Sequence, residues 1–502
     1  MTDCIHIGQA AKRDGCVLAY GHFNTIHPGH IRYLRHAREL GPDLVVALEG
    51  DGAEDEPNPH PFSQTERAEA LGLVGLADAI VLLHSNELEE VINVLKPSVL
   101  VLGRELEGAN QLRGALDRLK SQGGKVEFHA GEVHYATTEL LNNSERDLRR
   151  RRREQFSDAC RRQGLCLENL LRSMQAWSNT HLIVLGDTIV DQYAACEAIG
   201  ISAEAPVVVV RELAQRNFIG AAAVVAAHIK ALGASCDLVS VVGNDSNADL
   251  VRNELQAMGI GDALSQDDSR PTTFKKRYVV DNQKLFRVSI VEEQNIDAEI
   301  EDQVIARLES LAPKSNGIVV SDFVYGVVTP RVLEAVHRLA KLHNLLLFGD
   351  LQCSTQVGSI TRFRKFSLLC PNERELRLAL QSTNGGIEHL SNQLLETSEC
   401  ERLVVKMAAE GFIAYDRKAN NSIVNQSFPA LSVNPVDVAG AGDSVLAVMA
   451  TGLASGQGMM PTAAIACCMA SLAVEVMGNK PISVAALRKN VEEVLAGFAK
   501  GS

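Results

Sequence analysis

Two histidines lie three positions apart in a glycine-containing turn near the start of the chain. The segment at 21–30 reads GHFNTIHPGH and contains His27, Gly29 and His30. We expect it to join a buried strand to a helix, because a short apolar run precedes it and apolar residues recur at helical spacing after it. A helix N-terminus offers free N–H groups to phosphate, and two imidazoles can donate to one phosphoryl group. A histidine pair is often structural, but this context favours a phosphate-handling site.

A second small-residue turn lies near the other end of the chain. Gly440, Ala441 and Gly442 precede Asp443, between an extended segment and an apolar helix. The free N–H groups of such a turn can form an anion hole for a transferring phosphoryl group. Asp443 lies where a carboxylate can take the proton from an attacking hydroxyl. The two turns together predict a chain that uses nucleoside triphosphates at two separate sites.

The composition limits the classes of protein to which the chain can belong. Its 502 residues are too many for one ordinary core, so we expect two domains. The formal net charge of -13 argues against general affinity for nucleic acid. No apolar run is long enough for a membrane span, and the first residues lack the apolar core of a signal peptide. The 11 cysteines form no metal-binding or paired spacing, which predicts reduced thiols in the cytoplasm.

Alternating strand and helix patterns divide the chain into two α/β regions. The first predicts a parallel sheet covered by helices and ends near residue 141. The segment that follows, at 145–154, contains the unbroken run Arg149 to Arg153. We interpret this segment as a solvated linker helix rather than a nucleic-acid or phosphate patch. Strand-like segments at 207–210, 272–280 and 285–290 precede a regular alternation from 317 onward, and they predict a separate small sheet. We therefore expect an N-terminal domain at 1–144, a basic helical linker at 145–176 and a large three-layer α/β domain with a β-lid at 177–502.

The first turn resembles the HxGH signature of the cytidylyltransferase-like nucleotidyltransferases. The resemblance covers roughly residues 16–142 and implies a Rossmann-like domain. The resemblance implies a nucleotide-binding set made of Phe23, Gly29, Arg104, Thr137 and Thr138. The two threonines can equally be a plain helix N-cap. Asn24 stands where the family usually has aspartate, and Leu102 where its sugar-nucleotide members have lysine. Arg104 is then the candidate for the missing cation.

The second turn resembles the Asp-Thr-x-Gly-Ala-Gly-Asp signature of the ribokinase-like carbohydrate kinases, over about 177–500. Asn372 and Glu375 match that family's Asn-x-x-Glu motif, which implies a role in placing Mg²⁺ and phosphate, with Glu375 acting on the metal indirectly. The alternative is an ordinary polar helix start after Pro371. Asp191 matches the carboxylate that holds sugar hydroxyls.

Three further segments, at 201–207, 271–277 and 282–287, resemble the lid of the heptose 7-phosphate kinases of ADP-heptose synthesis. Those kinases are commonly fused to a heptose 1-phosphate adenylyltransferase, with the kinase first, whereas the order here is reversed. The resemblance implies a sugar-binding set of Asp191, Gly220, Lys275, Arg277 and Arg287. The sugar pocket departs from the family pattern at three positions: Ala223 replaces asparagine, and Tyr325 and Gln352 replace lysines.

These observations predict a bifunctional sugar-activating enzyme. One domain is expected to phosphorylate the anomeric hydroxyl of a heptose phosphate with ATP and Mg²⁺, and the other to join the sugar 1-phosphate to a nucleotide. The alternatives are the same reactions on a different sugar, or a nucleotide-binding regulator or scaffold with one inactive domain, and the first site can use ATP or CTP. The expected partners are a sugar phosphate and a nucleoside triphosphate, without nucleic acid or membrane. A homodimer is expected through the strand-like lid segments 205–211 and 272–290, whose free edges favour pairing.

Overall fold

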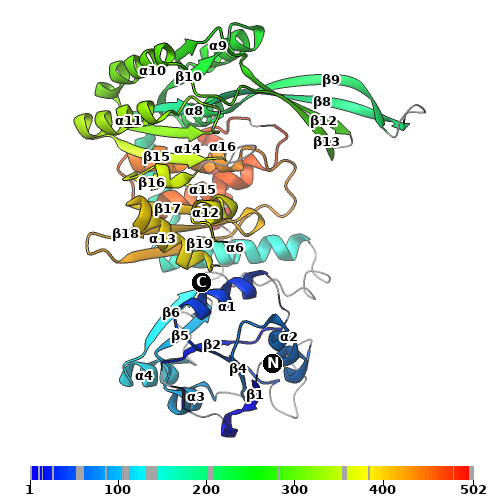
Figure 1. The fold of residues 1–502 in the computed structure, drawn as a ribbon, viewed down its shortest axis with the longest axis vertical. Helices are drawn as coiled ribbons and strands as arrows, with labels where there is room; N and C mark the ends of the chain where they lie inside the picture. Colours follow the sequence, from blue (N-terminus) through cyan, green and yellow to red (C-terminus); the bar gives the residue numbers. More distant parts are fainter. Residues whose placement is uncertain are drawn as a thin grey trace. The chain divides into compact units, whose positions relative to one another are not determined.

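The computed structural model describes residues 3–9, 12–13, 15–24, 26, 28–51, 62–84, 87–103, 106, 112–129, 145–201, 207–280, 283–352, 359–382, 385–478 and 480–496. The chain forms two compact units. Unit 1 comprises Met1–Leu148 with Leu380–Gln393, and unit 2 comprises Arg149–Ala379 with Leu394–Ser502. Figure 1 shows the helices and strands of both.

Unit 1 contains a parallel sheet in the order β1-β4-β3-β2-β5-β6. Its strands are β1 (Asp3–His6), β2 (Val17–Gly21), β3 (Leu44–Leu48), β4 (Ala79–Leu82), β5 (Val99–Gly103) and β6 (Lys125–His129). Its helices are α1 (Pro28–Glu39), α2 (Gln64–Val74), α3 (Leu88–Leu95) and α4 (Arg113–Ser121). The central strands are continuous apolar runs because helices cover both of their faces.

Successive residues of β2 pack into two different apolar cores, one on each face of the sheet of unit 1. Leu18 packs with α3 and α4 on one face of the sheet, whereas Val17 and Ala19 pack with α1 and α2 on the other. This is the doubly wound arrangement in which ligands bind beyond the carboxyl ends of the strands. The expectation of a Rossmann-like parallel sheet is confirmed.

Unit 2 is built on a sheet in the order β11-β10-β7-β14-β15-β16-β17-β18-β19, parallel as far as β17 and antiparallel beyond it. The strands are β7 (His181–Gly186), β10 (Ser235–Val242), β11 (Gly261–Gln266), β14 (Gly317–Asp322), β15 (Leu346–Leu351), β16 (Leu368–Leu369), β17 (Arg402–Lys406), β18 (Phe412–Arg417) and β19 (Ile423–Phe428). Its helices are α7 (Leu167–Gln175), α8 (Ala222–Ala231), α9 (Ser246–Met258), α10 (Ala298–Leu311), α11 (Pro330–His343), α12 (Glu373–Ala379), α14 (Ala441–Ala454), α15 (Met459–Ala473) and α16 (Val484–Ala496). Two more helices, α6 (Glu145–Arg162) and α13 (Ile387–Ser398), contain residues assigned to each of the two units. Among the described residues, no helix is both long enough and apolar enough to cross a membrane.

The basic helix α6, which contains the run Arg149 to Arg153, also packs into the core of unit 2. Phe156 and Cys160 of α6 are buried in the main apolar cluster, and the Phe156 ring lies 6.2 Å from that of Phe428. Around them, Arg150, Arg153 and Arg161 are partly or fully exposed. The expected solvated face therefore occupies one side of a helix whose other side packs on the core of unit 2.

The lid is a separate four-stranded sheet in the order β13-β12-β8-β9. Figure 1 shows β8 (Thr188–Ile201), β9 (Val208–Ala221), β12 (Thr273–Val280) and β13 (Gln283–Ile290) projecting from the body of unit 2. The small-sheet prediction is confirmed, but the predicted strand at 207–210 is too short and β8 was not predicted. Both β8 and β9 run for 14 residues. Neither strand is apolar along its whole length, because β9 is exposed at most of its residues and the polar Asp191 and Gln192 interrupt β8.

Candidate functional site

The histidine turn of unit 1 lies between β2 and α1. His30 is in the first turn of α1 with only 8% of its surface exposed, and its ring centroid lies 5.1 Å from that of Phe23. Gly29 lies in the same helical turn. His27, Arg104, Thr137 and Thr138 lie outside the described residues. The structure thus places Phe23, Gly29 and His30 together at the carboxyl end of a central strand.

A buried arginine holds this turn in place. Arg67 of α2 donates hydrogen bonds to the carbonyls of His22 and Glu49 and pairs with Asp51 at 2.7 Å. Its guanidinium therefore ties together the segments that follow β2 and β3. The planar five-donor head of arginine suits such a junction better than lysine.

Two departures from the family pattern lie in the described part of unit 1, where Asn24 is half-buried and Leu102 is buried. The Asn24 Oδ1 atom has no hydrogen-bond partner among the described residues. Leu102 is fully buried in β5. A leucine at this depth contributes packing and cannot replace a phosphate-binding cation.

In unit 2, the small-residue turn opens α14 as expected. Gly440 has a φ of 80° and is the N-cap residue, and as a glycine it has no side chain to cap the helix. Its left-handed backbone is one that a residue with a Cβ adopts only at a cost. Asp443, 4% exposed, lies in the first turn, where unpaired N–H groups and the helix dipole favour an anion.

The protonation of Asp443 is set by its surroundings. Burial raises its pKa to about 7, and the neighbouring carboxylates of Asp350 and Asp191 act in the same direction. Lys406 and a 2.9 Å hydrogen bond from the Gln352 side chain partly oppose the rise. A carboxylate with a pKa near neutrality is suited to accept a proton from a hydroxyl.

Lys406 is a second group at this turn that the sequence did not reveal. Its Nζ lies 2.7 Å from the Asp350 carboxylate and 3.1 Å from the position a Cβ on Gly442 would occupy. Burial alone would lower the pKa of Lys406, but Asp350 and Glu375 hold it above its usual value. Gly442 therefore allows a charged lysine to approach the start of α14.

Asn372 and Glu375 cap each other reciprocally at the start of α12. The Glu375 N–H donates to Asn372 Oδ1 at 2.9 Å, and the Asn372 N–H donates to Glu375 Oε2 at 2.7 Å. This pattern is a capping box. The capping alternative is thus present, and the same Glu375 carboxylate also raises the pKa of Lys406 beside the small-residue turn at 440–442.

The residues expected to bind sugar converge at the base of the lid. Asp191 of β8 forms an ion pair with Arg277 of β12. A Cβ on Gly220 would lie 2.7 Å from the Asp191 carboxylate, so the glycine makes room for it. Lys275, 3% exposed, has its Nζ 5.3 Å and 5.0 Å from the ring centroids of Phe323 and Tyr325. Arg287 lies opposite Arg277 on β13 and is exposed.

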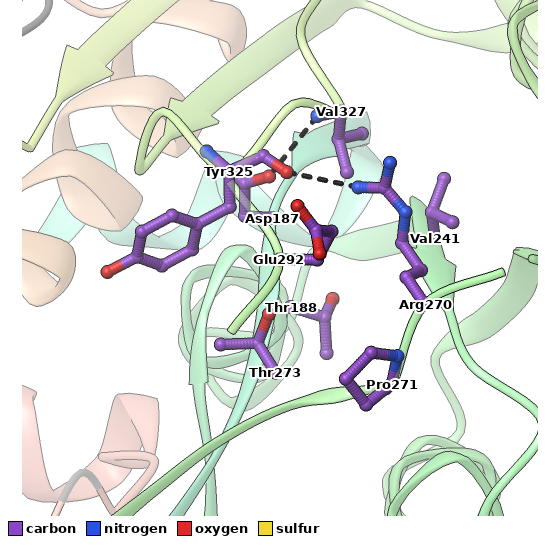
Figure 2. Close-up of a pocket in the computed structure, with 9 residues that line it drawn as sticks. All are labelled: Asp187, Thr188, Val241, Arg270, Pro271, Thr273, Glu292, Tyr325 and Val327. Carbon is purple, nitrogen blue, oxygen red and sulfur yellow. Dashed lines mark hydrogen bonds between the residues drawn. The ribbon is translucent and has the colours of Figure 1, made fainter. Parts of the chain in front are cut away.

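The substituted positions of the pocket have different surroundings. Ala223 is fully buried in α8, whereas Gln352 reaches Asp443. Tyr325 lines a small hollow together with Asp187 and Arg270. Figure 2 shows Arg270 donating to the Tyr325 carbonyl while the tyrosine ring extends away from the Asp187 carboxylate. Tyr325 therefore shapes the pocket through both its backbone and its ring on Lys275.

Comparisons with known proteins identify the families that the two regions of the chain match. Residues 179–484 match the model of the pfkB family carbohydrate kinases, and residues 18–147 match the cytidylyltransferase-like model. The Bifunctional protein HldE of Geobacter metallireducens is 30% identical over 307 residues, which are 60% of this chain and 61% of that protein. The protein of the same name from Campylobacter jejuni strain RM1221 is 30% identical over 332 residues, or 62% of this chain and 68% of the relative. The first of these alignments spans about three fifths of the relative's length.

The fold of unit 2 also resembles solved sugar kinases. Phosphofructokinase-2 from Escherichia coli in complex with substrates and products aligns with a TM-score of 0.52 at 15% identity, covering 64% of this chain and 100% of that one. Its complex with fructose-6-phosphate gives a TM-score of 0.51. At this identity the likeness concerns the fold. The predicted fold class and both family resemblances, with the cytidylyltransferase-like region first, are confirmed, and the chain belongs to the pfkB family of carbohydrate kinases.

Proposed function

We propose that the protein is a bifunctional sugar-activating enzyme, with a nucleotidyltransferase at 1–144 and a sugar kinase at 177–502 joined by the basic segment 145–176. The observation that carries the proposal is the buried Asp443, with its pKa near 7, at the open N-terminus of α14. Relatives named Bifunctional protein HldE and the matches to both family models support it. The lid segments that resemble heptose 7-phosphate kinases favour a heptose phosphate as the sugar.

In the kinase reaction, Asp443 takes the proton of the anomeric hydroxyl. The hydroxyl oxygen forms a bond to the γ-phosphorus of ATP, the bond between that phosphorus and the bridging oxygen breaks, and ADP leaves. N–H groups of Gly440, Ala441 and Gly442 stabilise charge on the transferring group. Lys406 adds a positive charge beside them. Asp191, Gly220, Lys275, Arg277 and Arg287 orient the sugar phosphate.

The acidic groups near the turn fit Mg²⁺ bound mainly through ATP. Magnesium is commonly held by one or two carboxylates together with substrate phosphates. Asp350 Oδ1 is buried and has no hydrogen-bond partner among the described residues, and Glu375 lies near the same lysine. These two carboxylates are the groups that would hold the ion or its water ligands. The ion would supply neutralisation of phosphate charge.

In the nucleotidyl transfer, the sugar 1-phosphate attacks the α-phosphorus of a nucleoside triphosphate and pyrophosphate leaves. His27 and His30 donate to the phosphoryl oxygens as charge builds on them. Phe23, Gly29, Arg104, Thr137 and Thr138 complete the proposed nucleotide site. Either ATP or CTP is compatible with this chemistry.

A second candidate function keeps both reactions and changes the sugar. Three positions favour it, because Ala223 offers no side-chain hydrogen bond and Tyr325 and Gln352 carry no charge. Losing a hydrogen bond to a buried sugar hydroxyl costs about 0.5–1.5 kcal/mol. A sugar with a different hydroxyl or phosphate arrangement would avoid this loss.

The experiment is to incubate the purified protein with a panel of sugar phosphates and with ATP or CTP, and to identify products by mass spectrometry. We expect heptose 7-phosphate or a related sugar to gain a phosphate and then a nucleotide. Asp443→Asn should slow formation of the phosphorylated sugar by ~10²–10⁴-fold. His30→Ala should prevent only the later attachment of the nucleotide. Failure of the wild-type protein to turn over any pair would support the regulator or scaffold instead.

We also propose a cytoplasmic homodimer that forms through the lid. The described residues contain no disulfide, as expected in a reducing compartment. The lid exposes a group of apolar side chains on its outer strands: Val208, Val209, Leu213, Leu285, Phe286, Val288 and Ile290. An apolar sheet with free edges favours pairing with a second copy.

A further inference from the structure

A buried carboxylate connects the lid to the loop that leads into α14. Asp437 is 5% exposed and accepts four hydrogen bonds. Two come from the lid: Lys284 Nζ at 2.7 Å and the Tyr193 hydroxyl at 2.9 Å. The other two come from backbone N–H groups in the body, those of Ala439 at 3.0 Å and Gly478 at 3.3 Å. Half of the donors to this carboxylate therefore belong to the lid.

On the lid side, Tyr193 connects Asp437 to Asp191, the carboxylate proposed to bind the sugar. The Arg277 guanidinium lies 5.3 Å from the centroid of the Tyr193 ring, and Lys284 Nζ lies 5.7 Å from it. Arg277 is also the ion-pair partner of Asp191. Tyr193 thus lies between the group proposed to hold the sugar and the group that holds the loop.

On the body side, Asp437 holds the backbone of the residues that lead into the turn at 440–442. Its Oδ1 atom accepts from Ala439 N–H, directly before Gly440, and it is the same oxygen that Lys284 contacts. Burial would raise the pKa of Asp437, but Lys284, Ala439 and Tyr193 together hold it below its usual value. A buried carboxylate that loses its donors is strongly destabilised. Movement of the lid away from the body would therefore remove two donors from the residue that orients the turn.

We infer that Lys284 is a positioning residue that links closure of the lid to the geometry of the phosphate-binding turn at 440–442. Closure on a sugar completes the donor set of Asp437 and fixes the turn in the orientation that receives the transferring phosphoryl group. The inference rests on the proposed kinase activity for its kinetic consequence, whereas its structural consequence is independent of that activity.

The test compares Lys284→Met with Lys276→Met. Lys276 lies on the adjacent strand and pairs at 2.7 Å with Glu212 within the lid, so it controls for loss of a lid ion pair that does not reach Asp437. Hydrogen exchange of the peptide covering 436–442 is measured by mass spectrometry in the full-length protein. We expect several-fold faster exchange in Lys284→Met than in the wild-type protein, and wild-type exchange in Lys276→Met and Lys284→Arg.

The kinetic measurement uses heptose 7-phosphate and MgATP with the same variants. A misplaced turn should lower kcat roughly ten- to hundredfold in Lys284→Met, because small misplacements of reacting groups are costly. KM for ATP should stay near the wild-type value, and Lys284→Arg should restore kcat. If the wild-type enzyme does not phosphorylate this sugar, the proposed substrate fails and exchange alone decides the inference. Equal exchange in the two methionine variants overturns it.

Discussion

At the scale of single residues, Gln352 is the substitution with the clearest chemical consequence. The family usually has lysine at this position, and here a neutral amide donates to Asp443 at 2.9 Å. A positive charge beside a carboxylate lowers its pKa more than a neutral hydrogen bond does. The near-neutral pKa of the proposed base is thus connected with one of the changes in the sugar pocket.

The first prediction concerns the pH dependence of the kinase. Because the base acts when deprotonated, kcat/KM in the wild-type enzyme should rise with pH through about 7. Gln352→Lys should move this rise to lower pH by about one unit or more, and Gln352→Met should move it to higher pH. Rate–pH profiles of the three proteins give the measurement. Identical profiles would show that Asp443 is not the titrating base.

A second prediction links the same carboxylate to stability. The pKa of Asp443 is raised from 3.8 to about 7 on folding, so the folded state keeps this proton over a range where the unfolded chain has lost it. The contribution of Asp443 to stability therefore falls as pH rises from about 4 to about 7 and stays low above that. Asp443→Asn should unfold at a higher temperature than the wild-type protein at pH 8, with a smaller difference at pH 5. Thermal unfolding at the two pH values measures this, and a difference that does not change with pH would contradict it.

At the scale of elements, the start of α14 combines backbone conformation with chemistry. Gly440 adopts a φ of 80° at the point where we propose that the chain presents its N–H groups to phosphate. Lys406 at the end of β17 and Asp350 in β15 reach the same place from neighbouring parts of the sheet. The turn is therefore supported by parallel strands on one side and by the lid, through Asp437, on the other.

The third prediction separates the local cost of a positive φ from its functional effect. Gly440→Ala should destabilise unit 2 by about 1 kcal/mol and reduce kinase turnover, because a left-handed backbone disfavours a Cβ. Gly456→Ala is the matched control. Gly456 has a φ of 84°, with nothing within 4 Å of an added Cβ. It should show a similar loss of stability with wild-type turnover. Equal turnover in both variants would mean that the conformation of the turn does not limit the reaction.

At the scale of the whole molecule, the lid serves two proposed purposes. Its inner part carries Asp191 and Arg277, and its outer strand β13 is exposed along its length. Such exposure of apolar residues is expected to favour association with another copy. The same sheet would then cover the sugar and form the subunit interface.

The fourth prediction tests this association. The wild-type protein should be a dimer by light scattering at micromolar concentration, and Phe286→Glu should shift it to monomer because a charge cannot be buried in an apolar interface without a partner. Phe286 is 48% exposed in the single chain. Leu342→Glu, at a residue of α11 that is 69% exposed and lies outside the lid, is the control and should remain dimeric. A monomeric wild-type protein would contradict the proposed dimer.

The sequence by itself determined the fold class and predicted where the proposed chemistry takes place. Periodic apolar patterns report burial locally, so the alternating strands and helices around β2 and around β14 were predictable. The turn at 440–443 was also readable, because its glycines and carboxylate are neighbours in the chain. In contrast, β8 was not predicted, because polar residues such as Asp191 and Gln192 interrupt its apolar residues along the chain.

Only the tertiary structure decided which distant residues complete the site. Lys406 meets Asp350 across 56 positions, and Lys284 meets Asp437 across 153. Tyr193 reaches the same aspartate from 244 positions away. Such pairs depend on strand order, register and the fold of the lid over the body, which place side chains together without leaving a pattern along the chain. Burial of Asp443 among these groups sets its protonation, so the sequence located the proposed base and the fold determined its pKa.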